Sequence, residues 1–127
     1  ALGGLMKKNI LFCEDDPDLQ DQTAELLEEA FPESLVILCE NGLDAIDQLR
    51  CMDFDIILSD FDMKTQGGDG LSLFEYTEKQ GLSIPFILYS GHSVLEFSHI
   101  KNNRFHFVDK LTTDPNQIKN ILKDLLQ

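Results

Sequence analysis

The stretch FDIILSD, residues 54–60, decides the fold of this chain. Its apolar run predicts a buried β-strand, which places the Asp60 carboxylate at the strand's carboxyl end. A second run, ILFC at residues 10–13, predicts another buried strand, and the acidic residues 14–16 follow it directly. Continuous rather than alternating apolar strands are typical of a parallel sheet covered on both faces. Because ligands bind at the carboxyl edge of such sheets, the acidic residues after these strands mark a candidate site.

Strand and helix patterns alternate five times along the chain, which implies βαβ units with right-handed crossovers. Asp16-Pro17, an N-cap followed by proline, predicts the start of the first helix. Asn41-Gly42 is expected to be a turn before the second helix. Strands are expected near residues 9–13, 35–38, 54–60, 84–89 and 105–108, and helices near 17–30, 45–49, 71–77, 93–101 and 115–126. The sequence therefore predicts an α/β fold, one doubly wound (βα)5 domain.

Composition limits the partners that this chain can have. Its 127 residues suit one domain, and residues 1–6 are interpreted as an expression remnant without fixed structure ahead of a domain at 7–127. A net charge of -13 argues against direct binding of nucleic acid or of an anionic membrane. Cys13, Cys39 and Cys51 are odd in number and lack ligand spacing, so they are expected to be reduced, structural thiols of a cytoplasmic protein.

Polar side chains follow four of the expected strands, and all of them should reach one edge of the sheet. Two carboxylates about 4 Å apart repel by about 4 kcal/mol at an effective dielectric of about 20, and a hard cation such as Mg²⁺ relieves this. A hydroxyl and an ammonium at the same edge suit the oxygens of a phosphoryl group, and a carboxylate can accept phosphorus as an acyl phosphate. The side chains concerned are Glu14, Asp15, Asp60, Ser90 and Lys110.

Five motifs occur in an order and spacing that resemble response-regulator receiver domains, the phosphoacceptor modules of bacterial two-component signalling. They are ILFCEDDP at 10–17, the strand and Asn-Gly turn within 36–49, IILSDFDM at 56–63, ILYSG at 87–91, and FVDK at 107–110. Each motif alone is weak, whereas five in order are strong. The resemblance covers residue 7 to the end and implies a flavodoxin-like fold with a parallel five-stranded sheet in the strand order 2-1-3-4-5.

The resemblance also implies a role for each matching residue. Asp60 would accept the phosphoryl group, with Ser90 and Lys110 contacting its oxygens. Mg²⁺ (or Mn²⁺) would be bound by Asp15 directly, by Glu14 largely through water, by Asp60, and by the backbone carbonyl of Asp62. Phe107 would occupy the aromatic switch position, although plain core packing explains a phenylalanine there as well.

The partners that the resemblance implies are proteins. A sensor histidine kinase or a phosphotransfer protein would supply the phosphoryl group from a phosphohistidine. A downstream effector, or a covalently linked output domain, would read the change on a face made by helix 93–101, strand 105–108 and the last helix. Such a domain is a monomer or a phosphorylation-dependent dimer. It is not an enzyme, beyond Mg²⁺-dependent self-phosphorylation and self-dephosphorylation.

Two departures from the family pattern keep other functions open. Lys64 and Leu111 stand where the family commonly has proline, and the loop 64–70 is longer than usual. One alternative is an enzyme, because Asp60 and Asp62 form the Asp-x-Asp pair of phosphatases with an aspartate nucleophile. The other is a degenerate receiver that binds partners without phosphate. Outside the site, Asp16 is expected to be an N-cap rather than a metal ligand, and the three histidines are expected to face solvent.

Overall fold

The computed structural model describes residues 7–61, 63, 69–91, 97 and 99–126. Its elements along the chain are β1 (Asn9–Cys13), α1 (Pro17–Ala30), β2 (Leu35–Cys39), α2 (Gly42–Cys51), β3 (Ile56–Asp60), α3 (Gly70–Lys79), β4 (Phe86–Ser90), β5 (Phe105–Asp109) and α4 (Pro115–Leu126). The five expected strands are confirmed to within two residues at each end. Most of the helix expected at 93–101 lies outside the described residues, so the described part of the chain contains four helices.

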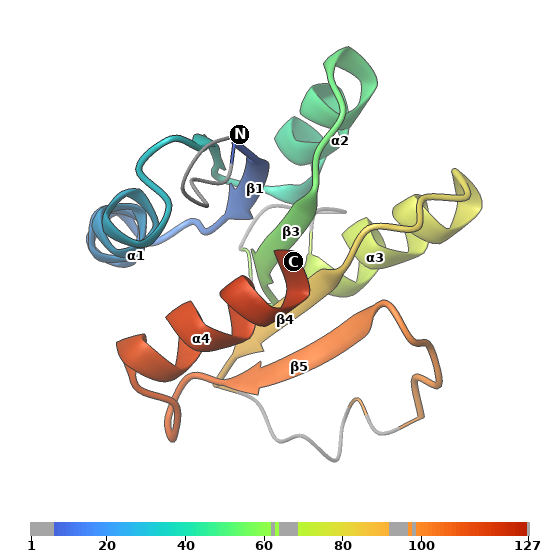
Figure 1. The fold of residues 1–127 in the computed structure, drawn as a ribbon. Helices are drawn as coiled ribbons and strands as arrows, with labels where there is room; N and C mark the ends of the chain where they lie inside the picture. The colour runs from blue at the N-terminus through green and yellow to red at the C-terminus, as the bar shows by residue number, and fades with distance from the viewer. Residues whose placement is uncertain (1–6, 62, 64–68, 92–96, 98, 127) are drawn as a thin grey trace.

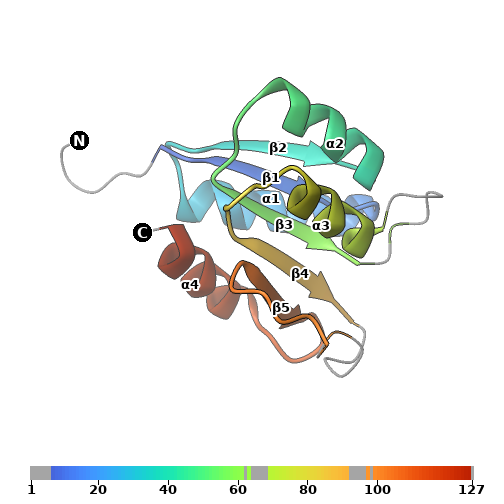
Figure 2. The same cartoon turned by 90° about the vertical axis from the view of Figure 1, so that its right-hand side faces the viewer.

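The strands form one parallel sheet in the order β2-β1-β3-β4-β5. This confirms the predicted α/β doubly wound fold and the strand order 2-1-3-4-5. The register pairs Cys13 with Cys39, Asp60 with Tyr89, and Ser90 with the last residue of β5. The carboxyl ends of neighbouring strands therefore meet at one edge, on the right of Figure 2.

Helices cover both faces of the sheet, as Figure 1 shows. Side chains alternate along each strand, so Ile10 and Ile56 pack into one core cluster while Leu11 and Ile57 pack into the other. The first cluster is closed by α1 and α4, and the second by α2 and α3. Two buried faces explain why these strands read as continuous apolar runs.

Side chains at the helix starts fix where the helices begin. Asp16 accepts hydrogen bonds from the backbone N–H groups of Asp18 and Leu19, which confirms the predicted N-cap of α1. Asn41 caps α2 in the same way, so the Asn-Gly pair expected to be a turn is in fact the start of that helix. At α4, Asp114 and Gln117 exchange hydrogen bonds of 3.0 and 2.8 Å, which is a capping box.

Arg104 ties the start of β5 to α3 and to the residues before β4. Its guanidinium donates to the Ile84 carbonyl at 2.7 Å and to Thr77 Oγ1 at 2.9 Å, and it forms an ion pair with Glu78 at 3.2 Å. The same group lies over the Phe74 ring, 5.2 Å from its centroid. This network holds the edge of the sheet that lies opposite the candidate site.

Some residues outside the site can be compared with expectation. All three cysteines are free, with Cys13 and Cys39 buried and Cys51 exposed. His99 is exposed as expected, but His106 is half-buried in β5, where burial lowers its pKa. His92 lies outside the described residues. Among the residues that the structure describes, no helix is both long and apolar enough to span a membrane.

Candidate functional site

Glu14 leaves β1 at the carboxyl edge of the sheet and is buried there. Its backbone N–H donates to the Cys39 carbonyl at 2.9 Å, which continues the pairing of β1 with β2 by one residue. Its own carbonyl accepts from the Gln20 side-chain amide, and its Oε2 accepts from the Asp16 backbone at 3.3 Å. The start of α1 therefore holds Glu14 in position, and only 2% of the residue is exposed.

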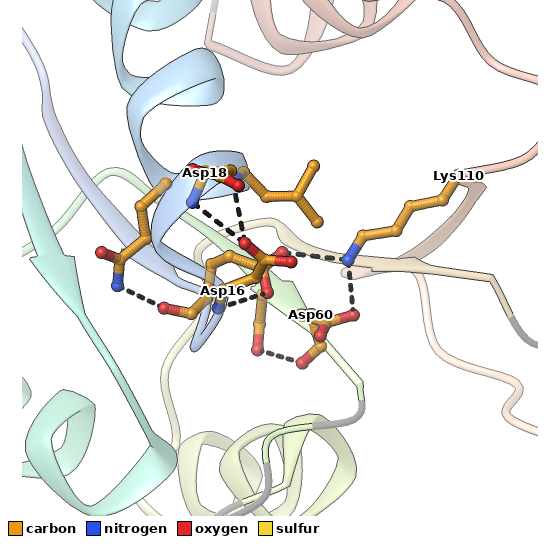
Figure 3. Close-up of polar contacts among 8 residues, drawn as sticks. Asp16, Asp18, Asp60 and Lys110 are labelled. Carbon is orange, nitrogen blue, oxygen red and sulfur yellow. Dashed lines mark hydrogen bonds and ion pairs between the residues drawn. The ribbon is translucent and has the colours of Figure 1, made fainter.

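Lys110 joins Glu14 to Asp60 across the site. Asp60 is the last residue of β3 and is 7% exposed, and Lys110 follows β5 directly. The Lys110 Nζ donates to Glu14 Oε1 at 2.9 Å and to Asp60 Oδ1 at 3.0 Å. Figure 3 shows Lys110 reaching over to Asp60, with Asp16 and Asp18 beside them at the start of α1. Glu14 and Asp60 thus share one ammonium group, although they lie 96 and 50 positions before Lys110 in the chain.

Burial and ion pairing shift the pKa values of Glu14 and Lys110 in opposite directions. Burial raises the pKa of Glu14 above its ordinary value, and the nearby Asp60 adds to this, although the Lys110 ammonium partly offsets it. Burial alone would lower the pKa of Lys110, but hydrogen bonds and charge attraction from Glu14 and Asp60 outweigh it, so the pKa of Lys110 is raised. Lys110 therefore stays protonated as the counter-ion of the cluster.

The same residues have the composition of a site for a hard cation. One carboxylate oxygen from each of Glu14, Asp15 and Asp60 lies within 4.8 Å of the other two. Oxygen ligands of this kind suit Mg²⁺, which usually takes one or two carboxylates together with water and phosphate oxygens.

Ser90 lies at the carboxyl end of β4, next to this cluster, and is fully buried. Its carbonyl accepts from the Lys110 backbone N–H at 2.9 Å, which fixes the loop after β5 against β4. The Lys110 ammonium also lies 5.4 Å from the centroid of the Tyr89 ring. The structure thus brings Glu14, Asp15, Asp60, Ser90 and Lys110 to one edge of the sheet. Asp62 lies outside the described residues.

An aromatic row beside the site was not expected from the sequence. Phe61, which follows Asp60, packs edge-on against Phe97 with the ring centroids 5.2 Å apart, and Phe97 contacts Phe107 at the same distance. Phe107 is half-buried against the core under α2 and α3. A continuous path of rings therefore connects the residue after Asp60 with the expected switch position.

Gly70, the first residue of α3, is a second feature that the sequence analysis missed. A Cβ at Gly70 would lie 2.6 Å from the Asp60 carbonyl and 2.6 Å from a Leu88 methyl group. The Gly70 N–H donates to the Phe61 carbonyl at 3.0 Å. Only a residue without a side chain lets the start of α3 pack this closely behind Asp60. Glycine after aspartate was the available signal, but it equally suits a loop.

The sequence matches the response regulator receiver domain family over residues 10–123, and the chain belongs to that family. Members of this family act in two-component signalling, are generally phosphoacceptor switches rather than turnover enzymes, and generally bind Mg²⁺ at an acidic pocket. No curated protein matches the sequence significantly.

Solved structures show the same fold. One is the receiver domain of the Francisella response regulator 1452, with a TM-score of 0.80, 19% identity, and coverage of 94% of this chain and 97% of that one. A second is the chemotaxis response regulator CheY4 of Vibrio cholerae, with a TM-score of 0.79, 17% identity, and coverage of 95% and 100%. A third is RcsB from Salmonella enterica, bound to the promoter rprA in the presence of the phosphomimetic BeF3-. Its TM-score is 0.78 at 20% identity, with coverage of 94% and 61%.

Proposed function

We propose that this domain is a phosphorylation switch in which Asp60 accepts a phosphoryl group from the phosphohistidine of a histidine kinase or phosphotransfer protein. The observation that carries the proposal is the Lys110 ammonium, which bridges the buried Asp60 and Glu14 carboxylates at the end of β3. A salt bridge of this kind is a poor way to stabilise a fold, because burying the charges costs much of what their attraction returns. At a phosphoacceptor the same charges have a chemical use.

In the proposed reaction an Asp60 carboxylate oxygen attacks phosphorus, and an acyl phosphate bond forms as the phosphorus–nitrogen bond of the phosphohistidine breaks. The electron pair of that bond returns to the imidazole nitrogen of the donor. Lys110 stabilises the negative charge that spreads over the phosphoryl oxygens, and the Ser90 hydroxyl, at the same edge, donates to one of them. Asp60 is held at the strand end, so its carboxylate needs little reorganisation to react.

The proposed cation is Mg²⁺ or Mn²⁺, held by Asp15, Asp60, Glu14 largely through water, and the backbone carbonyl of Asp62. When bound, the cation would neutralise the phosphoryl oxygens that approach the cluster. The support for it is the mutual proximity of the three described carboxylates, one oxygen of each lying within 4.8 Å of the other two. Burial raises the Glu14 pKa, and a bound cation would act against this shift by favouring the ionised carboxylate.

The proposed output is a change in the face formed by residues 93–101, β5 and α4. Lys110 and Ser90 contact phosphoryl oxygens only in the phosphorylated state, so they bias the loops after β5 and β4 toward a second arrangement. Phe107 could follow this change through its contact with Phe97. The reader would be an effector protein or a linked output domain; RcsB, a longer chain with this fold, was solved on DNA with a phosphomimetic. In this view the domain works in the cytoplasm.

The test uses a small acyl phosphate, such as acetyl phosphate, as donor in the presence of Mg²⁺. The wild-type chain should gain the mass of one phosphoryl group on the peptide that contains Asp60, and chelation should prevent the gain. Asp60→Asn should gain nothing, whereas Asp53→Asn should react like wild type. Asp53 is a matched control because it is exposed, precedes β3 and loses the same charge.

Each alternative would give a different result in this test. Phosphorylation of Asp60→Asn, or mapping of the phosphoryl group to another residue, would refute Asp60 as acceptor. A phosphatase would release phosphate from small esters over many turnovers. A degenerate receiver would take up no phosphoryl group and would still bind its partner.

A further inference from the structure

Cys13 and Cys39 end two neighbouring strands and are direct partners across the sheet. Both side chains belong to the core cluster that α2 covers, so they leave the sheet on the same face. Neighbouring strands lie about 4.8 Å apart, which is within the range of about 4.4–6.8 Å between Cα atoms that a disulfide requires. The two cysteines therefore stand on neighbouring strands at backbone positions that a disulfide can span.

The two thiols differ in their access to solvent. Cys13 is fully buried, whereas Cys39 is 5% exposed and lines an open hollow of about 340 Å³ between β2 and α2. Glu40, Asp44 and Asp47 also line this hollow. An acidic entrance disfavours anionic oxidants such as glutathione disulfide and admits a small neutral one. A thiol that lines a hollow, with a second thiol beside it on the neighbouring strand, can be oxidised to a sulfenic acid and then resolved as a disulfide.

We propose that Cys13 and Cys39 form a redox-active pair, which hydrogen peroxide converts to a disulfide between β1 and β2. The Cys39 sulfur, as its thiolate, attacks one peroxide oxygen. The O–O bond breaks, hydroxide leaves and becomes water on protonation, and Cys39 becomes a sulfenic acid. The Cys13 sulfur then attacks the Cys39 sulfur, the S–O bond breaks, and the leaving hydroxide takes the Cys13 proton as a second water. Two thiols lose two electrons, and one peroxide becomes two waters.

The disulfide would also act on the neighbouring acidic site, a consequence that rests on the proposed function. Glu14 follows Cys13 directly, and its N–H donates to the Cys39 carbonyl at 2.9 Å. A bond between the two cysteines constrains the peptide that carries Glu14, and with it the position of Glu14 relative to Lys110 and Asp60. Oxidation is therefore expected to weaken metal binding at the site.

The first experiment maps the bridge in the folded Cys51→Ser variant, which removes the exposed thiol. After hydrogen peroxide treatment and alkylation, the Cys13 and Cys39 peptides should be linked, with the loss of two hydrogen atoms and full reversal by dithiothreitol. Cys39→Ala in the same background should form no bridge and should leave Cys13 unoxidised. Oxidation of Cys39 to a sulfinic acid beside a free Cys13, or two thiols that stay unreacted while the protein is folded, would overturn the proposal. Circular dichroism of each variant establishes that it is folded.

The second experiment compares Mn²⁺ affinity in the reduced and oxidised forms of Cys51→Ser. We expect several-fold weaker binding after oxidation and full recovery after reduction. Equal affinities with the bridge formed would refute the coupling to Glu14. If neither form bound Mn²⁺, the proposed function would fail, while the peptide map would still decide whether the bridge exists.

Discussion

Replacing Lys110 by methionine removes the ammonium between the Glu14 and Asp60 carboxylates. At the observed 2.9 and 3.0 Å, each attraction amounts to about 5 to 6 kcal/mol at an effective dielectric of about 20. Most of this is offset by the cost of burying the ammonium, and removing one partner of a buried pair typically costs about 3–5 kcal/mol. Because 17% of the Lys110 side chain is exposed, solvent screening favours the lower value, about 3 kcal/mol.

The loss is measured by urea unfolding at neutral pH in the presence of a chelator, followed by circular dichroism. In thermal unfolding, a loss of about 3 kcal/mol corresponds to a fall in Tm of about 10 °C for a domain of this size. Lys101→Met is the matched control, because Lys101 is exposed and the variant changes the net charge equally. It should shift the free energy of unfolding by less than about 0.5 kcal/mol. Equal effects of the two substitutions would refute the inference that the Lys110 ion pairs are worth more than a surface charge.

Wild type and Lys110→Met also test the direction of the Lys110 pKa shift. A lysine whose pKa is raised on folding contributes stability that is fully present below its unfolded pKa and is lost as pH rises through the folded pKa. The stability gap between wild type and Lys110→Met should therefore be constant from neutral pH up to the ordinary lysine value of 10.5 and shrink only above it. Urea unfolding at a series of alkaline pH values measures this gap. A gap that closes already near neutral pH would contradict the raised pKa.

Three further substitutions test other parts of the structure. Because burial raises the Glu14 pKa, Mn²⁺ affinity should fall as the pH decreases through a value above 4.5, and Glu14→Gln should move that fall to lower pH; Mn²⁺ titrations at several pH values decide this. Gly70→Ala should lower the free energy of unfolding by about 1–3 kcal/mol, because the new Cβ would lie 2.6 Å from the Asp60 carbonyl. Gly91→Ala, whose Cβ meets no described atom within 4 Å, should have little effect, and equal Tm values for the two variants would disprove the close approach. Arg104→Lys should cost about 1–3 kcal/mol in urea unfolding, because an ammonium cannot reproduce the forked hydrogen bonds of the guanidinium, and an unchanged midpoint would show that the network is not needed.

Local signals in the sequence were sufficient for the strands and for most helix starts. A buried strand in a parallel sheet reads as an apolar run, and Asp16-Pro17 satisfies the free N–H groups of a helix within three residues. Such features depend on neighbours in the chain and can therefore be predicted from it. The strand ends then brought the acidic residues to one edge, because the topology alone requires it.

Contacts between distant residues were beyond sequence reasoning. The shared edge predicted that Lys110 and Asp60 lie near each other, but not that the Lys110 ammonium also binds Glu14. The Arg104 network went unnoticed because its partners lie on α3 and before β4, with no local pattern to reveal them. Asn41 was assigned to a turn because the same asparagine chemistry serves turns and N-caps, and only the following packing decides between them.

The charges of the site impose an order on the proposed reaction. Lys110 now serves two carboxylates, and phosphorylation of Asp60 would replace one of these by phosphoryl oxygens that carry more negative charge. If Lys110 turned fully to those oxygens, the buried Glu14 would lose its partner, and an unpaired buried carboxylate takes up a proton or destabilises the fold. A cation bound by Glu14 and Asp15 removes this conflict, since it compensates Glu14 and frees Lys110 for the phosphoryl group. On the proposed function, metal binding should therefore precede phosphorylation and be needed to keep Lys110 on the phosphoryl oxygens.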